Sequence, residues 1–394
     1  MRQFRIPATF MRGGTSKALV FHARDLPADR TLWPDIFRAA IGANDPYGRQ
    51  LDGMGGGISS LSKVCVIAPS ARADADIDYS FFQLSPTADT VDESSNCGNM
   101  SSAMGPFAVD EGLVAVTGEA ARVRIYNTNT DKIIISRFAM DDGRAAVDGD
   151  FELPGVAGLG SPVSLDFLRP GGARTGKILP TGNVRDWLTL ADGSTIEASM
   201  VDAANPCVFV RAGDVGALGN ESPLAMDNDA ALLAKLEAIR QAASVAMGIG
   251  GSLAEAERMP AAPKVAFVAP PLDSTTLDGK TMAAGEVDLL ARMISVGAPH
   301  RAIPLTGALC TACAAKIEGT LVHEVTRPGK LVRVGQASGT TVVDADVQRQ
   351  ADGAWHAETA SVLRTQRRLM DGFVYVSAAK TPGLRTVSAA RAAE

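Results

Sequence analysis

The segment Asn96-Cys97-Gly98-Asn99-Met100 places a cysteine where a helix is expected to begin. The first N–H groups of a helix have no intrahelical partner, and together with the helix dipole they stabilise a thiolate or a bound carboxylate. Asn96 and Asn99 add side-chain donors and can cap the helix. The alternative is that Cys97 is a small apolar residue of the core, the commoner role of a buried cysteine. The flanking asparagines and glycine favour the chemical role.

A second polar segment, Arg12-Gly13-Gly14-Thr15-Ser16-Lys17, lies between two strand-like runs. Its glycines let a ligand approach the backbone closely, and its arginine, hydroxyl and lysine side chains can donate hydrogen bonds to an anion. The segment is similar to part of a phosphate-binding loop, but the full Gly-x-x-x-x-Gly-Lys-Ser/Thr spacing is absent. It is either an anion-binding cradle or a solvated turn between strands.

Lys63 follows a glycine-rich loop at 52–62 and opens an apolar run at 64–68. A lysine at such a boundary is partly removed from water, which favours the neutral amine, the form that acts as a general base. The alternative is a surface lysine whose aliphatic stem lies along the strand. Composition alone favours the surface lysine.

Cysteine and histidine residues in the second half of the chain could bind a metal or titrate near neutral pH. Cys310-Thr311-Ala312-Cys313 has redox or metal spacing, with His323 as a further ligand. No second cysteine pair follows, and the segment is typical of an apolar helix, so we predict no metal site. His300 lies just before this helix and could reach an interface.

Short runs rich in Val, Ile and Phe predict most of the strands. The expected strands are 6–11, 17–22, 63–68 and 77–83, with a hairpin formed by 122–127 and 132–138. Helical period and helix-start signals predict the helices. The expected helices are 33–41, 99–112, 230–247 and 286–296. Many short strands with a few buried helices indicate an α+β chain.

A weak internal repeat suggests two similar domains. Cys97-Gly98-Asn99-Met100 leads through a small apolar helix to Glu111-Gly112. Thr306-Gly307-Ala308-Leu309 leads in the same way to Glu318-Gly319. Read as a duplication, the repeat places one helix at the corresponding position of each domain.

The length of 394 residues agrees with two domains, at about 100–200 residues per domain. We place the N-terminal domain at 1–183 and the C-terminal domain at 184–370, with a strand at about 371–386 returning to the first. The net charge of −6 does not attract nucleic acid or an anionic membrane surface. A polyanionic substrate must therefore depend on a local cluster of donors.

The apolar segments and the cysteines of the sequence indicate the cellular compartment. No apolar stretch of signal-peptide length follows 1–5, and no run approaches the roughly 18 apolar residues of a membrane span. The five cysteines, an odd number in a long chain, suit a reducing compartment better than a disulfide framework. We expect a cytoplasmic protein.

A series of short motifs extends in order over nearly the whole chain. These motifs are 11–17, 45–56, Ser62-Lys63, 96–99, Pro180-Thr181-Gly182-Asn183, 264–271, Ser338-Gly339-Thr340 and 370–374. Together they resemble the PrpF family. Its members include 2-methylaconitate cis–trans isomerase, 3-methylitaconate Δ-isomerase and 4-oxalomesaconate tautomerase (Δ-isomerase).

The resemblance implies a diaminopimelate-epimerase-like fold. In that fold two pseudo-symmetric domains each wrap a curved mixed β-sheet around a central helix, and the active site lies between them. The resemblance also implies that Lys63 is the general base and that Cys97 faces it across the substrate. Epimerases of this fold use two cysteines, whereas Thr306 stands at the second position here. Because a hydroxyl is too weak an acid to replace a thiol, we expect no two-thiol stereoinversion.

Further residues around this pair are expected to bind substrate. They are Arg12, Thr15, Ser16, Lys17, Ser62, Asn96, Gly98, Asn99, Met100, Lys280, His300, Thr306, Gly307, Ser338 and Gly339. No metal or organic cofactor is expected. The expected partner is a small unsaturated tricarboxylate, with no nucleic acid or membrane, and the chain could form a homodimer.

We therefore expect a cofactor-independent isomerase that moves a double bond by a 1,3-allylic proton shift. The segment 91–95 favours 4-oxalomesaconate, from protocatechuate-type aromatic breakdown, whereas 45–48 favours 2-methylaconitate, from propionate (methylcitrate) metabolism; we lean to the former. A non-catalytic accessory protein for an aconitase-like hydratase is an alternative, and intact Lys63 and Cys97 argue against it. A two-base racemase is a third alternative.

Overall fold

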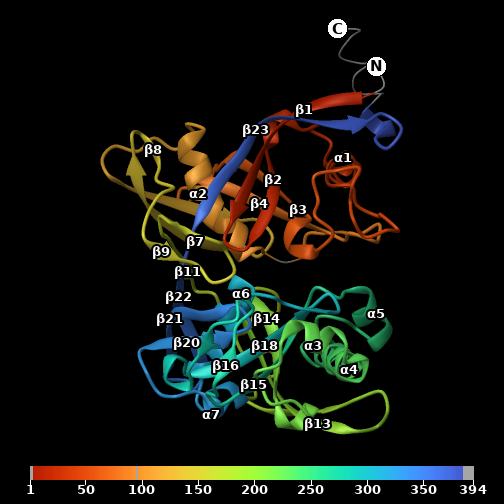
Figure 1. The fold of residues 1–394 in the computed structure, drawn as a ribbon, viewed down its shortest axis with the longest axis vertical. Coiled ribbons are helices and arrows are strands. Elements are labelled where there is room, and N and C mark those ends of the chain that lie inside the picture. The colour runs from red at the N-terminus through yellow and green to blue at the C-terminus, as the bar shows by residue number, and fades with distance from the viewer. Residues whose placement is uncertain (1–2, 95, 385–394) are drawn as a thin grey trace.

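The computed structural model describes residues 3–94 and 96–384. Figure 1 shows two lobes, one above the other, with the last strand, β23 (Gln366–Ser377), running back into the upper lobe. Ser95, in the motif before the cysteine, and residues 385–386 of the expected returning strand lie outside the described residues. Within the described ranges no helix is long and apolar enough to cross a membrane.

The N-terminal lobe is a mixed sheet with helices on both faces. Its strands are β1 (Gln3–Gly13), β2 (Ser16–His22), β3 (Lys63–Pro69), β4 (Ile77–Leu84), β5 (Val91–Asp92), β6 (Ala120–Asn127), β7 (Lys132–Asp141), β8 (Arg144–Ala145), β9 (Phe151–Glu152), β10 (Leu159–Gly160) and β11 (Val163–Leu168). Val20 and Cys65 pack with the central helix α2 (Gly98–Asp110), while Leu19 and Val64 pack with α1 (Trp33–Ile41). Coverage on both faces explains why β2 and β3 are almost continuously apolar.

The C-terminal lobe repeats this arrangement. Its strands are β12 (Asp186–Thr189), β13 (Thr195–Ala203), β14 (Asn205–Arg211), β15 (Lys264–Ala269), β16 (Ser274–Thr275), β17 (Thr281–Met282), β18 (Leu289–Ser295), β19 (Ala298–Pro299), β20 (Leu331–Gln336), β21 (Gly339–Arg349) and β22 (Trp355–Arg364). Its helices are α3 (Pro223–Asp227), α4 (Ala230–Ala246), α5 (Leu253–Arg258), α6 (Leu305–Lys316) and α7 (Leu321–Val325). One-turn 3-10 helices lie at 23–25, 30–32, 59–61, 213–215 and 284–286.

Strand pairing follows one order in both lobes. In the first lobe, β2–β3 is parallel, β3–β4 antiparallel, β4–β6 parallel and β6–β7 antiparallel. In the second, β14–β15 is parallel, β15–β18 antiparallel, β18–β20 parallel and β20–β21 antiparallel. The α+β fold with two pseudo-symmetric halves is therefore confirmed.

The two similar halves are joined by strand pairing. Hydrogen bonds between β11 and β22 connect the strands of both lobes into one sheet, and β23 pairs with β1 along its length. The domain bounds at 183 and 370 stay a prediction, because the sheet continues across them.

The central helices α2 and α6 are buried on all sides. Every residue of α2 from Gly98 to Val109, and every residue of α6 from Leu305 to Ala315, is buried. Their N-terminal ends meet, since a Cβ atom at Gly98 would lie 2.5 Å from Cδ2 of Leu305 and 3.0 Å from Cγ2 of Thr306. The first turns of both helices are therefore held together where the lobes join.

The helices expected at 33–41, 99–112 and 230–247 are confirmed as α1, α2 and α4, within two residues at each end. The helix expected at 286–296 is wrong, because the chain forms strand β18 there. Every residue of β18 is buried, since the strand lies between β15 and β20 and packs on both faces. A strand covered on both faces is apolar at every position, and periodicity does not separate it from a buried helix.

Gly13 sets the distance between β1 and α2. A Cβ atom there would lie 2.6 Å from the carbonyl oxygen of Asn99 and 3.0 Å from Cα of Met100. We predict that Gly13→Ala lowers the free energy of unfolding by about 1–3 kcal/mol, the usual cost of overpacking. The control Gly285→Ala has no atom within 4 Å of the added Cβ and should change it by less than about 0.5 kcal/mol. Urea unfolding measures both, and equal effects would contradict the tight contact.

Candidate active site

Lys63 is the first residue of β3 and is buried, with 8% of the residue exposed. Its Nζ donates to Oε1 of Gln83 at 2.5 Å and lies 5.0 Å from the centre of the Phe81 ring. The Gln83 amide is fixed, because its Nε2 donates to three backbone carbonyl oxygens. Lys63 is therefore held inside the protein and is not the surface lysine that composition favours.

Cys97 lies immediately before α2 and is also buried. Its backbone is extended, its side chain does not cap the helix, and no acidic residue occupies the first turn of α2. The carbonyl oxygen of Cys97 accepts hydrogen bonds from the hydroxyls of Ser101 at 3.2 Å and Tyr79 at 3.4 Å. The thiol thus lies at the positive end of a helix dipole that no side chain of the first turn neutralises.

Cys65 shows that Lys63 and Cys97 share one environment. Cys65 lies two positions beyond Lys63 on β3, hence on the same face, and packs with Cys97 in the core around α2. Burial raises the pKa of the Cys65 thiol, the charge of Cys97 raises it further, and Lys63 lowers it. Cys65 therefore stays a neutral thiol, and Lys63 and Cys97 are both close enough to act on it.

Asn99 connects the start of α2 to two other segments. Its Nδ2 donates to Oγ1 of Thr15 at 3.1 Å, and its Oδ1 accepts from Nε of Arg364 at 3.2 Å. Arg364 ends β22 and is 4% exposed, and burial lowers its pKa to about 10, so it stays charged at neutral pH. Among the described residues no carboxylate forms an ion pair with it. Arg364 was missed by the sequence analysis, because an arginine at a strand end carries no local signal.

Arg12 and Lys17 of the polar turn lie away from this network. Nη1 of Arg12 donates to the carbonyl oxygens of Gly14 and Thr365 and to Oγ1 of Thr365. Arg12 also lines a separate cavity of about 400 Å³ together with Arg367. Nζ of Lys17 lies 5.5 Å from the ring of Phe10, whose side chain packs with the outer core, opposite α2. The turn therefore brings Thr15, not its two cations, to the start of α2, and the binding roles of Arg12 and Lys17 stay predictions.

Other expected residues of the N-terminal lobe are buried around the same point. Ser16 begins β2 and is 3% exposed. The Ser62 hydroxyl donates to Oε1 of Gln50 at 2.6 Å and so holds the glycine-rich loop. Asn96 accepts a 3.5 Å hydrogen bond from Ser101. Gly98 and Met100 contribute buried backbone at the helix start.

The C-terminal lobe brings His300, Thr306 and Gly307 to the junction. Thr306 lies beside Gly98, and its Oγ1 accepts a 3.4 Å hydrogen bond from Nδ2 of Asn205. Gly307 packs against Met293, where a Cβ would overlap the sulfur atom. His300 is half-buried, and removal of its ring from water, followed by the charges of Lys264 and Lys63, lowers its pKa to about 3. His300 is therefore neutral, and its Nε2 has no hydrogen-bond partner in the described structure.

Ser338, Gly339 and Lys280 lie at the edge of this region. The Ser338 hydroxyl donates to the carbonyl of Arg301 at 2.5 Å, and Pro154 lies against Gly339. Lys280 is 70% exposed at its side chain and pairs with Asp278 at 3.0 Å and with Glu152 at 3.6 Å. The structure does not bring Lys280 to Lys63, so its binding role stays a prediction.

Lys264 is a second residue that the sequence analysis missed. It opens β15 and is 9% exposed. Its charge lowers the pKa of His300, as the charge of Lys63 does, and Lys63 lowers the pKa of Lys264 itself. A signal was present, because Lys63-Val-Cys-Val-Ile-Ala-Pro and Lys264-Val-Ala-Phe-Val-Ala-Pro are two copies of one pattern. The internal repeat of the central helices therefore extends to strands β3 and β15.

Cys310 and Cys313 are buried in α6, away from any ligand set. Burial raises the pKa of both thiols, that of Cys313 to about 12. In the part of the chain that the structure describes, no group of three or more His, Cys, Asp or Glu residues could hold a metal ion.

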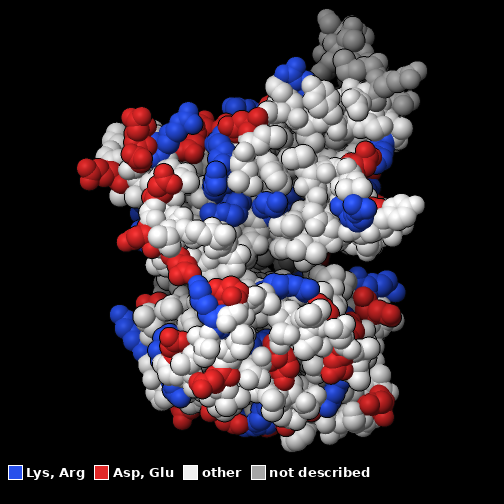
Figure 2. All heavy atoms as spheres, viewed as in Figure 1, with Lys and Arg blue, Asp and Glu red and all other residues white. Residues whose placement is uncertain are grey.

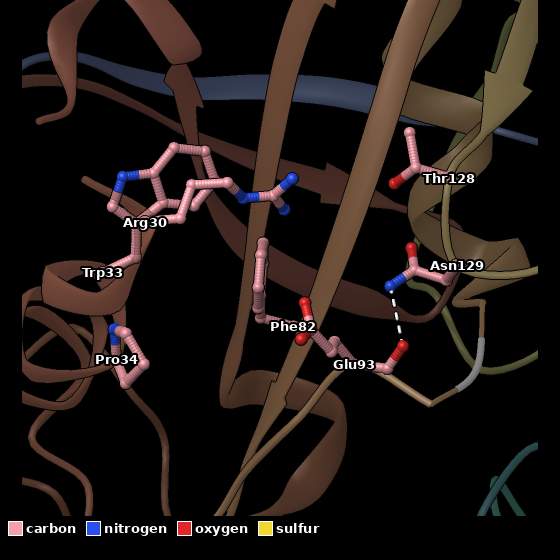
Figure 3. Close-up of a pocket in the computed structure, with 7 residues that line it drawn as sticks. All are labelled: Arg30, Trp33, Pro34, Phe82, Glu93, Thr128 and Asn129. Atoms are coloured by element: carbon pink, nitrogen blue, oxygen red, sulfur yellow. Dashed lines mark hydrogen bonds between the residues drawn. The ribbon is translucent and has the colours of Figure 1, made fainter. Parts of the chain in front are cut away.

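The surface is hollowed in more than one place. Figure 2 shows a recess between the two lobes, with Lys and Arg side chains on both margins. A different cavity, of about 330 Å³, lies on the flank of the N-terminal lobe (Figure 3). Phe82 lines it and packs with the outer core, whereas Phe81 beside Lys63 packs with the inner core, so this cavity is on the other face of β4. Asn129 donates to the Glu93 carbonyl there and so holds the segment that leads to Cys97.

Comparison with known proteins identifies the family. The model of the PrpF protein family matches residues 3–377. The chain belongs to the PrpF family. The 3-methylitaconate isomerase of Eubacterium barkeri is 42% identical over 383 residues, covering 96% of this chain and 99% of the relative. The 2-methyl-aconitate isomerase of Cupriavidus necator is 40% identical, covering 95% and 98%. The (4E)-oxalomesaconate Delta-isomerase of Novosphingobium sp. strain KA1 is 34% identical, covering 94% and 97%.

Solved structures agree with this assignment. A crystal structure of methylitaconate-delta-isomerase has a TM-score of 0.79 at 41% identity, covering 97% of this chain and 98% of that one. A hydroxyproline epimerase from Agrobacterium vitis has a TM-score of 0.53 at 12% identity, covering 96% and 94%, which shows the shared fold alone. The PrpF resemblance, the epimerase-like α+β fold and the expectation of an isomerase are confirmed.

Arg364, which donates to Asn99 at the helix start, is a candidate substrate-binding residue, and mutation tests that role. We predict that Arg364→Met raises KM by about tenfold, the loss expected for one charge-assisted hydrogen bond of about 1.5 kcal/mol. Stability should change little, because replacing a buried charge by an apolar side chain of similar volume is often neutral. The control Arg349→Met removes an exposed arginine that bonds the Gly353 carbonyl and should leave KM unchanged. Steady-state kinetics that show an unchanged KM for both variants would contradict the role of Arg364.

Proposed function

We propose that this isomerase moves a carbon–carbon double bond in a small unsaturated polycarboxylate by a 1,3-allylic proton shift. The observation that carries the proposal is the enclosure of Lys63 and Cys97 together, one at a strand start and one at the start of a central helix. Isomerases named for methylitaconate, methylaconitate and oxalomesaconate among the relatives support it. The proposed shift is redox-neutral and needs no external reagent for its balance.

Binding in the proposed mechanism uses the meeting helix ends. Substrate carboxylates accept hydrogen bonds from the free N–H groups that follow Cys97 and from the donors beside them, Thr15, Asn99 and Arg364. The N-terminal end of α6 at Thr306 faces the same point from the other lobe. Holding the anion at both helix ends orients the allylic carbon toward the reacting groups.

The proton transfer is assigned to Lys63. Its amine takes a proton from the carbon allylic to the double bond, and the electron pair of that C–H bond spreads into a dienolate. The helix ends and hydroxyls that bind the carboxylates stabilise the negative charge. The proton then returns to the other end of the three-carbon unit from Lys63, with Cys97 assisting, so the double bond moves by one position. Rotation of the delocalised intermediate gives the cis–trans isomer instead.

The comparisons change the order of candidate substrates. The sequence analysis leaned to 4-oxalomesaconate, but identities of 42% and 40% to the methylitaconate and methylaconitate isomerases exceed the 34% to the oxalomesaconate isomerase. We therefore propose a methyl-substituted itaconate or aconitate first and 4-oxalomesaconate second. The cytoplasmic location, the homodimer and a place in aromatic breakdown stay predictions.

Replacement of Lys63 tests the proposed base. We predict that Lys63→Met lowers kcat by at least about 10³-fold, within the range of general acid–base catalysis, because methionine cannot accept a proton. The control Lys330→Met, an exposed lysine of the other lobe, should keep the wild-type rate. Ultraviolet absorbance of 3-methylitaconate, 2-methylaconitate and 4-oxalomesaconate follows turnover. A Lys63→Met rate near that of the wild type would contradict the assignment, and a wild-type chain inactive on all three would contradict the proposed function.

Cys97 is proposed to assist, so its replacement should be milder. We predict that Cys97→Ser lowers kcat by less than about 10²-fold, below most of the range for a full acid–base catalyst. The control Cys313→Ser changes a buried thiol of α6 and tests whether any effect is one of stability alone. Steady-state kinetics with thermal melts of both variants give the answer, and a loss as complete as that of Lys63→Met would make the thiol essential.

A further inference from the structure

Lys63 has a counterpart in the C-terminal lobe. The pattern Lys-Val-x-x-(Ile/Val)-Ala-Pro begins at Lys63 in β3 and again at Lys264 in β15. Each lysine is the first residue of its strand to pair with the preceding parallel strand, Lys63 opposite Ala18 and Lys264 opposite Cys207. The two lysines therefore occupy the same place in the two halves of the fold.

The ammonium group of Lys264 is enclosed but only partly satisfied. Its Nζ donates to Oγ of Ser295 at 3.0 Å and to the carbonyl oxygen of Ala261 at 3.4 Å. An ammonium group has three N–H donors, so one is left for a further acceptor. Within the described residues no carboxylate forms an ion pair with Lys264. Asp92 of the other lobe is the acidic residue whose charge reaches it.

In the described part of the chain, none of the ionisable groups around Lys264 is close enough to form an ion pair with it. Its ionisable neighbours are Lys63, His300, Cys97, Cys207 and Asp92. His300 is neutral, as described above, and Lys63 brings a second amine to the site but no negative charge. An enclosed charge without a counter-charge is strongly unfavourable, so a site that brings two lysines together requires either an anion or loss of a proton.

We propose that Lys264 is a substrate-binding residue whose ammonium group holds one carboxylate on the C-terminal lobe while Lys63 acts on the neighbouring carbon. The inference rests on the proposed function and adds to it the residue that holds the substrate from the second lobe. The substrate class follows from the geometry, because an anion held at Lys264 and at the helix ends must carry at least two carboxylates.

Proton uptake is the signature of this arrangement. Burial lowers the pKa of Lys264 in the empty protein, and the charge of Lys63 lowers it further. A bound carboxylate favours the charged amine and so raises that pKa. At a pH between the two values, Lys264 is neutral when the site is empty and charged when it is filled. Anion binding therefore takes up a proton at Lys264, and the uptake disappears at a pH below the lowered value.

The experiment uses propane-1,2,3-tricarboxylate, a saturated anion that has no double bond to move. Isothermal titration calorimetry of the whole chain in buffers of different ionisation enthalpy gives both the affinity and the protons taken up. We expect Lys264→Met to weaken binding about 10–100-fold, the loss of a charge-assisted hydrogen bond, and to abolish the uptake. Lys264→Arg should retain more of the affinity. Lys330→Met, an exposed lysine of the same lobe, should bind as the wild type does.

Lys264→Gln is a second variant without the charge, for use if Lys264→Met does not fold. The glutamine amide can still donate to Ser295 or Ala261, so the fold should persist while the charge is lost. Unchanged affinity and proton uptake in folded Lys264→Gln or Lys264→Met overturns the proposal, as does failure of the wild type to bind the probe at millimolar concentration. Failure of the proposed function is separate, since it is seen as no turnover of any unsaturated substrate by a wild-type chain that binds the saturated anion.

Discussion

The meeting of two helix N-termini at Gly98 is the contact on which the site depends. Each central helix is enclosed by its own curved sheet, and their first turns touch because Gly98 has no side chain to separate them from Leu305 and Thr306. Two positive helix ends that face one point repel each other unless an anion lies between them. We therefore propose that the fold itself provides an anion-binding position, before any side-chain chemistry is added.

Basic side chains lie buried in the same region as the two helix ends. The chain as a whole carries a net charge of −6, yet Lys63, Lys264 and Arg364 are buried where the lobes join, and no carboxylate of the described residues forms an ion pair with them. In the proposed mechanism, a bound polycarboxylate supplies the negative charge that the protein does not place beside these basic side chains. The net negative charge of the protein does not attract an anionic substrate. Recognition in this proposal therefore depends on the local cluster of Lys63, Lys264 and Arg364.

Much of the fold could be predicted from the sequence, because local patterns determine it. Helices α1, α2 and α4 begin with clear signals, and the alternation in 122–138 indicates a hairpin. The segment 286–296 was wrongly predicted to be a helix, because strand β18 is buried on both faces and so is mostly apolar. Of the site, Lys63 and Cys97 could be found from their positions at the start of a strand and of a helix. Lys264 could have been found from the repeat of the Lys63 pattern. Arg364 could not, because its environment is made by contacts between segments far apart in the chain.

The most direct test of the proton shift is to follow the hydrogen atom itself. A substrate that carries deuterium at its allylic carbon would be converted by the wild-type chain in ordinary water, and NMR would locate the label in the product. Our account predicts that the label leaves its original carbon during turnover and appears in solvent or at the other end of the three-carbon unit. Product whose double bond has moved but which keeps all of its deuterium at the original carbon would contradict it, because no C–H bond would then have been broken there.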